Sequence, residues 1–343
     1  MGQRVLVVAT SPNSRGGIAT VVKAFRESYL WNKFNCRWVE THIDKSKLHK
    51  AYKLLKALIE YTFLLHRYDI VHIHVSTAVS LNRKYIFYKL AKLCKKKVIT
   101  HLHCGSQLSD IWNAKYEDIF INSDICLVLS NNIRDIIIER TGRQDNIRVL
   151  YNPCPTIANP QSTKPRKKHI LFAATLYKEK GYLDLIDAFA LVHTKHPDWK
   201  LLIAGNGSQE EGSSRVKSHS LDNSVVFLGW IKGEEKDDIF RTSSIFCLPS
   251  YAEGFPMAVL DAWAYGLPVV TTPVGGIPDI VVDGENGLLF NPGDVNTLAE
   301  KLNMLIESED LQIELSHKSQ SLVASTFSIT CITNQLNDIY SNI

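Results

Sequence analysis

Residues 245–271 read IFCLPSYAEGFPMAVLDAWAYGLPVVT, and this stretch decides the fold class. It begins with a short apolar run at 245–248 and ends with a β-branched run at 268–271. The interval 256–265 has the length and composition of a short helix, and Pro256 suits the first turn of such a helix. A strand, a helix and a second strand in this order predict parallel strands joined by a helical crossover.

The same alternation runs through the rest of the chain. In the first half it predicts strands at 4–9, 36–43, 69–75, 97–102, 125–129 and 147–150, with helices at 17–30, 47–66, 80–94 and 131–140. In the second half it predicts strands at 169–174, 200–204, 225–228, 245–248, 268–271 and 287–290, with helices at 181–194, 210–218, 234–240, 256–265 and 295–306. Many of these strands are apolar throughout, which is typical of a sheet covered on both faces.

Four prolines interrupt the alternation between residues 152 and 168, which indicates a linker. We therefore predict an α/β protein of two tandem doubly wound, Rossmann-like domains that face a cleft. The expected bounds are 1–152 for an acceptor-binding domain, 153–168 for the linker, 169–327 for a nucleotide-sugar-binding domain, and 328–343 for a C-terminal helix that packs back on the first domain.

The composition excludes several classes of protein. With 45% hydrophobic and 22% charged residues, the chain is globular and not disordered. The sequence contains no run of 18 apolar residues, so it predicts no membrane-spanning helix. The seven cysteines are odd in number and lack Cys-x-x-Cys spacing, which favours a cytoplasmic protein over a disulfide framework or a zinc ribbon.

Charged residues are distributed unevenly along the chain. Residues 1–155 hold 24 basic and 12 acidic side chains, although the whole chain carries only +4. Five lysines lie on the predicted helix at 47–66 or just before it, and a second group of lysines lies at 89–97. A basic amphipathic helix fits peripheral binding to an anionic membrane, here the inner face of the cell membrane. An ordinary amphipathic helix, packed on the core with its other face exposed to solvent, explains the same pattern. No nucleic-acid motif accompanies the charge.

Two features of the first half lie at predicted strand ends, where doubly wound folds bind ligands. Gly16 and Gly17 follow the first strand, and adjacent glycines let backbone N–H groups approach an anion. His101 and His103 alternate along the fourth strand and so share one face. A buried structural histidine explains this spacing as well as a functional one, but the position at a strand end favours function. A metal pair lacks nearby carboxylates, since the first to follow is Asp110.

Two further features lie in the second half. Lys180 precedes Gly181 at a predicted helix start, where its charge and the helix dipole both favour phosphate. Glu253 lies in the turn before the helix at 256–265, and Asp261 lies about two turns further on. Carboxylates at such positions suit the vicinal hydroxyls of a sugar. An acidic residue that merely balances the helix dipole would explain Glu253 alone.

Three absent motifs restrict the function further. The sequence contains no Asp-x-Asp pair for a metal-bound diphosphate and no Gly-x-x-x-x-Gly-Lys-Ser/Thr loop. Residues 205–207, Gly-Asn-Gly, lack the third glycine of a dinucleotide fingerprint. We therefore expect neither a metal ion nor another cofactor.

Several strings together resemble the family-four retaining glycosyltransferases of the GT-B fold. The most specific are EGFP at 253–256 with its continuation DAWAYGLPVV at 261–270, GGIPDIV at 275–281 and DGENGLL at 283–289. LIAGNG at 202–207 and FLG at 227–229 are also similar to that family. The resemblance spans nearly the whole chain and is densest between residues 169 and 290.

The resemblance implies an enzyme that transfers a hexose or N-acetylhexosamine, with retention and without metal, from a UDP-sugar. The implied acceptor is a saccharide, lipid-linked as in bacterial capsule or lipopolysaccharide synthesis. His103, Lys180 and Glu253 are the implied catalytic residues: His103 faces the transferred sugar, Lys180 holds the diphosphate, and Glu253 contacts sugar hydroxyls. The implied donor site also includes Gly16, Gly17, Thr175, Gly205, Trp230, Ile231, Gly254, Phe255, Met257, Ala258 and Asp261.

The chain departs from that family at two positions. Thr175 stands where an arginine commonly accompanies the lysine, so the leaving group loses a charge unless Lys178 or another cation replaces it. Asp261 stands where the family usually has a glutamate that grips the ribose, and it is one methylene shorter. Two alternative functions stay open at this point: a sugar-nucleotide epimerase or hydrolase, and a non-catalytic protein that binds nucleotides or polyanions.

Overall fold

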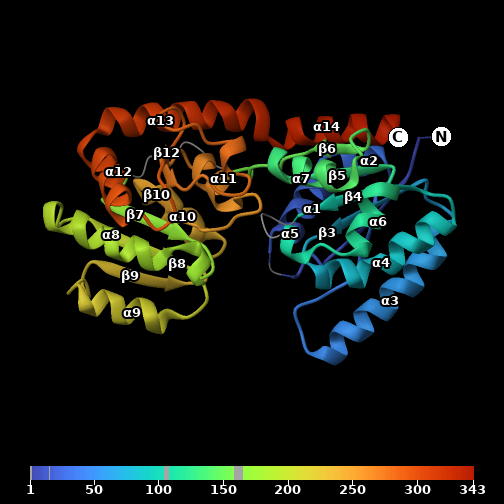
Figure 1. Cartoon of the computed structure of the whole chain (residues 1–343), viewed down its shortest axis with the longest axis horizontal. Coiled ribbons are helices and arrows are strands. Elements are labelled where there is room, and N and C mark those ends of the chain that lie inside the picture. Colours follow the sequence, from blue (N-terminus) through green and yellow to red (C-terminus); the bar gives the residue numbers. More distant parts are fainter. Residues whose placement is uncertain (1, 15, 104–107, 158–164) are drawn as a thin grey trace. The chain divides into compact units, whose positions relative to one another are not determined.

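The computed structural model describes residues 2–14, 16–103, 108–157 and 165–343. The chain divides into two compact units (Figure 1). Unit 1 comprises Met1–Pro153 together with Phe327–Ile343, and unit 2 comprises Cys154–Thr326. Much of the segment expected to be a linker therefore belongs to unit 2. Within it, the guanidinium group of Arg166 donates to the carbonyl oxygens of Ser243, Tyr265 and Gly266 at 2.7–2.9 Å.

Unit 1 is built on a six-stranded parallel sheet with the order β2-β1-β3-β4-β5-β6. Because right-handed crossovers run in opposite directions on either side of β1, they place helices on both faces of the sheet. The strands are β1 (Val5–Ala9), β2 (Arg37–Glu40), β3 (Ile70–Val75), β4 (Lys97–Leu102), β5 (Ile125–Val128) and β6 (Ile147–Val149).

The helices of unit 1 are α1 (Gly17–Glu27), α2 (Tyr29–Lys33), α3 (Lys47–Leu65), α4 (Ala78–Leu93), α5 (Leu108–Ile111), α6 (Ala114–Asn122), α7 (Asn131–Thr141) and α14 (Ile329–Asn342). The single helix expected at 17–30 is two helices, because Ser28 adopts extended backbone angles between α1 and α2. The C-terminal helix α14 packs within unit 1, where Tyr29 and Lys33 hydrogen-bond to Asn334 and Asn337.

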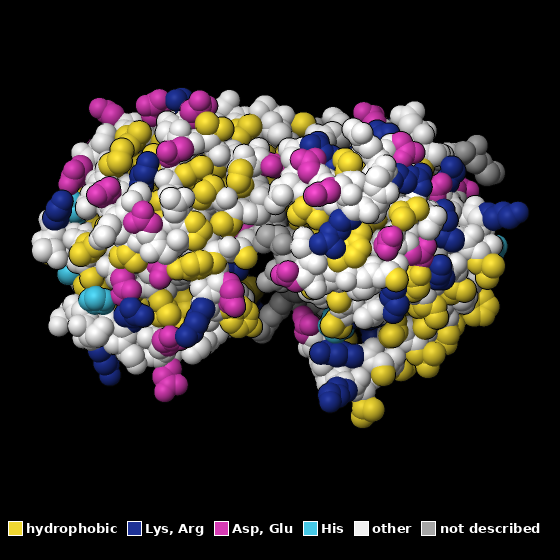
Figure 2. Space-filling model, in the orientation of Figure 1, with side chains coloured by type: hydrophobic (Ala, Val, Ile, Leu, Met, Phe, Trp, Pro, Cys, Tyr) yellow, Lys and Arg dark blue, Asp and Glu magenta, His cyan; other side chains and the backbone are white. Residues whose placement is uncertain are grey.

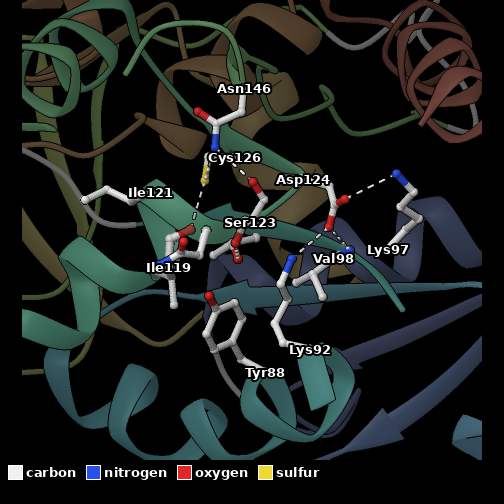
Figure 3. Close-up of polar contacts among 12 residues, drawn as sticks. Tyr88, Lys92, Lys97, Val98, Ile119, Ile121, Ser123, Asp124, Cys126 and Asn146 are labelled. Atoms are coloured by element: carbon white, nitrogen blue, oxygen red, sulfur yellow. Dashed lines mark hydrogen bonds and ion pairs between the residues drawn. The ribbon is translucent and has the colours of Figure 1, made fainter. Parts of the chain in front are cut away.

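The amino edge of the unit 1 sheet is held by the carboxylate of Asp124, just before β5 (Figure 3). It accepts a 2.9 Å hydrogen bond from the backbone N–H of Val98 and lies 3.3 Å from the ammonium groups of Lys92 and Lys97. These contacts lower the pKa of Asp124 against the opposing effect of burial. They fasten β4, β5 and α4 at the end of the sheet opposite to the predicted site.

Unit 2 contains a second six-stranded parallel sheet with the order β12-β11-β10-β7-β8-β9. Its strands are β7 (His169–Ala173), β8 (Lys200–Ala204), β9 (Val225–Gly229), β10 (Ile245–Leu248), β11 (Val269–Thr271) and β12 (Leu288–Leu289). Its helices are α8 (Tyr182–Lys195), α9 (Gln209–Ser218), α10 (Glu234–Thr242), α11 (Met257–Ala264), α12 (Val295–Glu307) and α13 (Glu309–Leu322). Short 3₁₀ turns lie at Lys178–Lys180 and Ile277–Asp279, and a π turn lies at Val323–Phe327.

The predicted fold class is confirmed: the chain has two tandem units, each with a parallel sheet and crossover helices. The stretch 245–271 forms β10, α11 and β11 as expected, with α11 beginning at Met257, one residue after Pro256. Every predicted strand is present, most of them shortened at an end.

Candidate functional site

Two loops of unit 2 meet at the carboxyl ends of β7 and β10. These strands are neighbours in the sheet, so the turns that follow them lie side by side. The backbone N–H of Tyr251 donates to the carbonyl oxygen of Glu179 at 2.8 Å. Gly181 has a φ of +68°, and a Cβ there would lie 1.9 Å from the carbonyl oxygen of Pro249. Only glycine permits this approach, so Gly181 is the residue that allows the two loops to pack together.

Lys180 and Glu253 form an ion pair where the loops meet. The Nζ of Lys180 lies 2.7 Å from Oε1 of Glu253, and the hydroxyl of Ser250 donates to the same oxygen at 2.6 Å. The Glu253 side chain is 8% exposed and that of Lys180 is 24% exposed. The carboxylate is therefore held in a defined position, while the lysine keeps access to solvent. Two residues that lie 73 positions apart and were predicted to act on one ligand are thus in direct contact.

The glycine pair at 275–276 packs against the backbone of the Glu253 turn. Gly275 has a φ of +59°, and a Cβ there would lie 1.8 Å from the carbonyl oxygen of Glu253. The N–H of Gly276 donates to the carbonyl oxygen of Gly254 at 3.0 Å. This explains why the two strings, EGFP and GGIPDIV, occur together: the second provides the surface on which the first is folded.

Asp261 has a different partner from Glu253. Its Oδ2 lies 2.8 Å from the Nζ of Lys236 on α10, and its side chain is 20% exposed. Burial raises the pKa of Asp261, and the charge of Lys236 opposes that rise. Phe255, Met257 and Ala258 form the turn and the first residues of α11 above it, with Phe255 buried.

The remaining predicted residues of unit 2 lie along the same edge of its sheet. Gly205 follows β8 and donates to the carbonyl oxygen of Gly229 at 2.7 Å, and a Cβ on Gly205 would lie 1.8 Å from the carbonyl oxygen of Ala174. Trp230 follows β9 and is 47% exposed, with the half-buried Ile231 after it. Thr175 is half-buried after β7.

The neighbouring Lys178, named above as a possible replacement for the missing arginine, forms an ion pair with Glu211 on α9 at 3.0 Å. Its side chain is 74% exposed, so the pair is a surface contact. Lys178 is therefore directed toward α9 in this structure.

In unit 1, Gly16 and Gly17 are exposed at the start of α1, where Gly16 has a φ of +112°. His103 is half-buried directly after β4, and its backbone N–H donates to the carbonyl oxygen of Val75 at 2.7 Å. Both features lie at the carboxyl edge of the unit 1 sheet, which is the expected edge.

His103 belongs to a cluster of four histidines, and two of them, His72 and His74, escaped the sequence analysis. His72 and His74 on β3 pair in register with Ile99 and His101 on β4. The ring of His74 hydrogen-bonds through Nδ1 to Nε2 of His103 at 2.9 Å. His72 contacts Nδ1 of His101 at 3.3 Å through Nε2, and the hydroxyl of Tyr340 at 2.6 Å through Nδ1. The alternation IVHIHV at 70–75 matches that of THLH at 100–103 and was the available signal.

Three members of the cluster also have a spacing that metal ions require. His72, His74 and His101 each place a ring nitrogen within 4.8 Å of the others, a grouping found among the residues that the structure describes. Two observations disfavour a cation there. Both ring nitrogens of His72 already have hydrogen-bond partners, Nδ1 of His101 and the hydroxyl of Tyr340. The ammonium group of Lys84 is buried beside them and donates to the carbonyl oxygen of His74.

Burial keeps the cluster neutral. Desolvation lowers the pKa of His72, His74 and His103 well below the ordinary value, and it lowers the pKa of His101 to about 3. The neighbouring imidazoles and Lys84 add to the effect for His103. His103 is therefore a neutral imidazole at physiological pH.

The α3 helix presents apolar side chains to solvent. The stripe comprises Leu48, Tyr52, Leu55, Ile59 and Phe63, which are 51–83% exposed. Only Ala57, Tyr61 and Leu65 are fully buried on this helix. Figure 2 shows this hydrophobic surface over α3, with lysine and arginine side chains beside it. An ordinary core-facing helix does not explain this arrangement, since the apolar stripe faces outward.

The second basic cluster is weaker than its sequence suggests. Lys89 pairs with Asp118, while Lys92 and Lys97 pair with Asp124.

No helix among the described residues is both long and apolar enough to cross a membrane.

Comparison with known proteins agrees with this geometry. Residues 155–321 match the family model described as glycosyl transferases group 1. An uncharacterized glycosyltransferase of Haemophilus influenzae is 30% identical over 199 residues, which is 57% of this chain and 56% of that protein. The capsular polysaccharide biosynthesis glycosyltransferase CapM of Staphylococcus aureus is 30% identical over 174 residues, or 50% of this chain and 45% of its own length. The chain thus spans about half the length of these curated relatives.

The fold is matched over nearly the whole chain. The crystal structure of Anabaena Alr3699/HepE in complex with UDP covers 99% of this chain and 100% of its own, with a TM-score of 0.80 and 18% identity. The two sheets thus have the architecture of a GT-B protein. Residues 155–321 therefore match a group 1 glycosyl transferase domain, in agreement with the resemblance of the motifs between residues 169 and 290.

Proposed function

We propose that this chain is a retaining, metal-independent glycosyltransferase of surface-polysaccharide synthesis. It moves a hexose or N-acetylhexosamine from a UDP-sugar to a saccharide acceptor that is lipid-linked. The matched domain, the similarity to CapM and the fold shared with a UDP-bound protein support this proposal.

The observation that carries the proposal is the contact between Lys180 and Glu253 at the carboxyl edge of unit 2. In the structure each side chain neutralises the other. A diphosphate that arrives there brings two negative charges and competes for the ammonium group. Glu253, still held by Ser250, is then available to accept hydrogen bonds from sugar hydroxyls.

The reaction follows from these charges. As the anomeric bond breaks, negative charge grows on the diphosphate and positive charge on the sugar ring. Lys180 stabilises the diphosphate, and the carboxylate of Glu253 lies near the developing oxocarbenium ion. The acceptor hydroxyl attacks from the face that the diphosphate leaves, which retains the configuration. The departing phosphate takes the proton of that hydroxyl, so no covalent nucleophile is needed.

A thermal-shift screen tests the donor site. Nucleoside diphosphates and nucleotide sugars should raise the melting temperature of the wild type in the presence of a chelator, because a ligand that binds only the folded form stabilises it. Lys180→Met should abolish the shift. Lys178→Met is the matched control, since Lys178 pairs with Glu211 and should leave the shift unchanged. Stabilisation that requires a divalent cation would contradict the proposal.

Turnover needs a separate assay. Donor consumption in the absence of acceptor would indicate an epimerase or a hydrolase instead, and donor binding without turnover on any acceptor would indicate a binding protein.

The α3 surface supports a lipid-linked acceptor. Lys45, Lys47, Lys50 and Lys56 are exposed beside the apolar stripe, and this combination suits an anionic bilayer. Each buried leucine or phenylalanine side chain contributes about 1.5–3 kcal/mol to such binding.

Flotation with anionic liposomes tests this surface. The wild type should float at low salt, and Leu55→Glu with Phe63→Glu should reduce the bound fraction at least about tenfold. The matched control is Leu55→Met with Phe63→Leu, which keeps both positions apolar and should leave the bound fraction unchanged. The proposal of membrane binding fails if the wild type stays in the aqueous fraction at low salt.

A further inference from the structure

The buried face of His103 is occupied by a second imidazole. Nδ1 of His74 lies 2.9 Å from Nε2 of His103, so one ring nitrogen of His103 is engaged inside unit 1. The other, Nδ1, has no hydrogen-bond partner among the residues that the structure describes, so it is the atom available to a ligand. Only one proton lies between the two rings, and its position decides whether Nδ1 of His103 donates or accepts a hydrogen bond.

The surroundings of His74 favour one of the two positions. Its other nitrogen, Nε2, is buried and has no hydrogen-bond partner among the described residues. A proton on Nε2 would be a buried donor without an acceptor, which proteins avoid more strictly than a lone pair without a donor. The Lys84 ammonium group, which donates to the backbone of the same residue, also favours a lone pair nearby. The proton of His74 therefore belongs on Nδ1, and His74 donates to His103.

We infer that His74 is a positioning residue that fixes His103 as the neutral tautomer with its proton on Nδ1. His103 then offers a sugar bound at the carboxyl edge of unit 1 a hydrogen-bond donor without a positive charge. This inference deepens the proposed function and rests on it for the ligand. A neutral donor is suited to a ring that becomes cationic, since an imidazolium at the same place would oppose the developing charge.

The rest of the cluster holds His74 in place without touching His103 by a hydrogen bond. His72 stacks on His74 with ring centroids 4.3 Å apart and is itself bound to the hydroxyl of Tyr340. Tyr340→Phe therefore removes a polar contact of the cluster while leaving the His74–His103 bond intact. It is the matched control for a change at His74.

Nitrogen NMR of the full chain with labelled histidine tests the tautomer directly. The resonances of His103 are identified by their absence in His103→Gln. At pH 7.5 we expect a protonated Nδ1 and an unprotonated Nε2 in His103, with no conversion to imidazolium down to pH 6. A proton on Nε2, or a charged ring, would overturn the inference. This result is independent of activity, so it stands apart from any failure of the proposed function.

Kinetics test the consequence. His74→Leu removes the donor and should lower kcat about tenfold, as expected for one hydrogen bond, while the donor KM changes less than about threefold. His74→Asn can still donate through its amide and should recover most of kcat. Tyr340→Phe should stay within about twofold of the wild type. Equal activity of His74→Leu and the wild type, or an equal loss in Tyr340→Phe, would show that His74 has no positioning role; if His74→Leu does not fold, the Asn variant and the NMR result decide.

Discussion

Lowering the pH from 7.5 to 5.5 should destabilise unit 1 through its histidine cluster. His72, His74 and His101 are fully buried, and burial depresses the pKa of each below its ordinary value. A histidine with a depressed pKa stays neutral in the folded protein but takes up a proton in the unfolded chain. Its contribution to stability is therefore present above the unfolded pKa and is lost as the pH falls toward the folded pKa.

The magnitude follows from the unfolded pKa of about 6.5. Between pH 7.5 and 5.5, protonation favours the unfolded chain by about 1.4 kcal/mol for each histidine that remains neutral when folded. The three histidines together give about 4 kcal/mol, a large part of the stability of an ordinary domain. Most carboxylates stay ionised over this interval, so they add little.

Urea unfolding at the two pH values measures this loss, with hydrogen exchange of peptides from β3 and β4 as the readout for unit 1. His101→Asn keeps a hydrogen-bonding atom near the position of Nδ1 and should reduce the loss by about 1.4 kcal/mol. The exposed His49→Gln is the control and should not change it. A loss below about 1 kcal/mol in the wild type, or an unchanged loss in His101→Asn, would refute the reasoning.

Three further changes have defined outcomes. Gly275→Ala should displace the Glu253 turn, because the new Cβ would lie 1.8 Å from the carbonyl oxygen of Glu253, and calorimetry should show donor affinity at least about tenfold lower; unchanged affinity would contradict this. Lys236→Met leaves the buried carboxylate of Asp261 without its cation and should lower the stability of unit 2 by about 1–3 kcal/mol in urea, and adding Asp261→Asn should restore it; no restoration would show that the charge is not the cause. Asp124→Ala should lower the free energy of unfolding of unit 1 by about 1–2 kcal/mol in urea. Donor affinity should not change, because Asp124 lies at the end of the unit 1 sheet opposite to Gly16 and His103; a change in affinity would contradict that placement.

The fold was predictable because its strands are short, apolar and separated by helices of regular period. The parts that escaped prediction have weaker patterns. The break between α1 and α2 depends on the backbone of Ser28, which no proline or glycine marks. The helix α13 lacks a strong apolar stripe and was not predicted.

The candidate site was predictable only in part, because His72 and His74 escaped the sequence analysis, and so did the partners of the residues that it named. Strand ends and glycines placed Lys180 and Glu253 on one edge of unit 2, and the structure adds that they touch. Nothing in the sequence pairs Asp261 with Lys236, because that contact joins two helices. The direction of the apolar stripe on α3 also depends on packing, since periodicity alone gives a stripe but not the side that it faces.

The role of Lys180 as the holder of the donor diphosphate is tested most directly by comparing the dissociation constants of UDP and UMP in the presence of a chelator. The wild type should bind UDP at least about tenfold more tightly than UMP, because the second phosphate gains a charge-assisted hydrogen bond. In Lys180→Met that preference should fall below about threefold. An undiminished preference for UDP in the variant, or a preference that appears only when a divalent metal is added, would contradict the account.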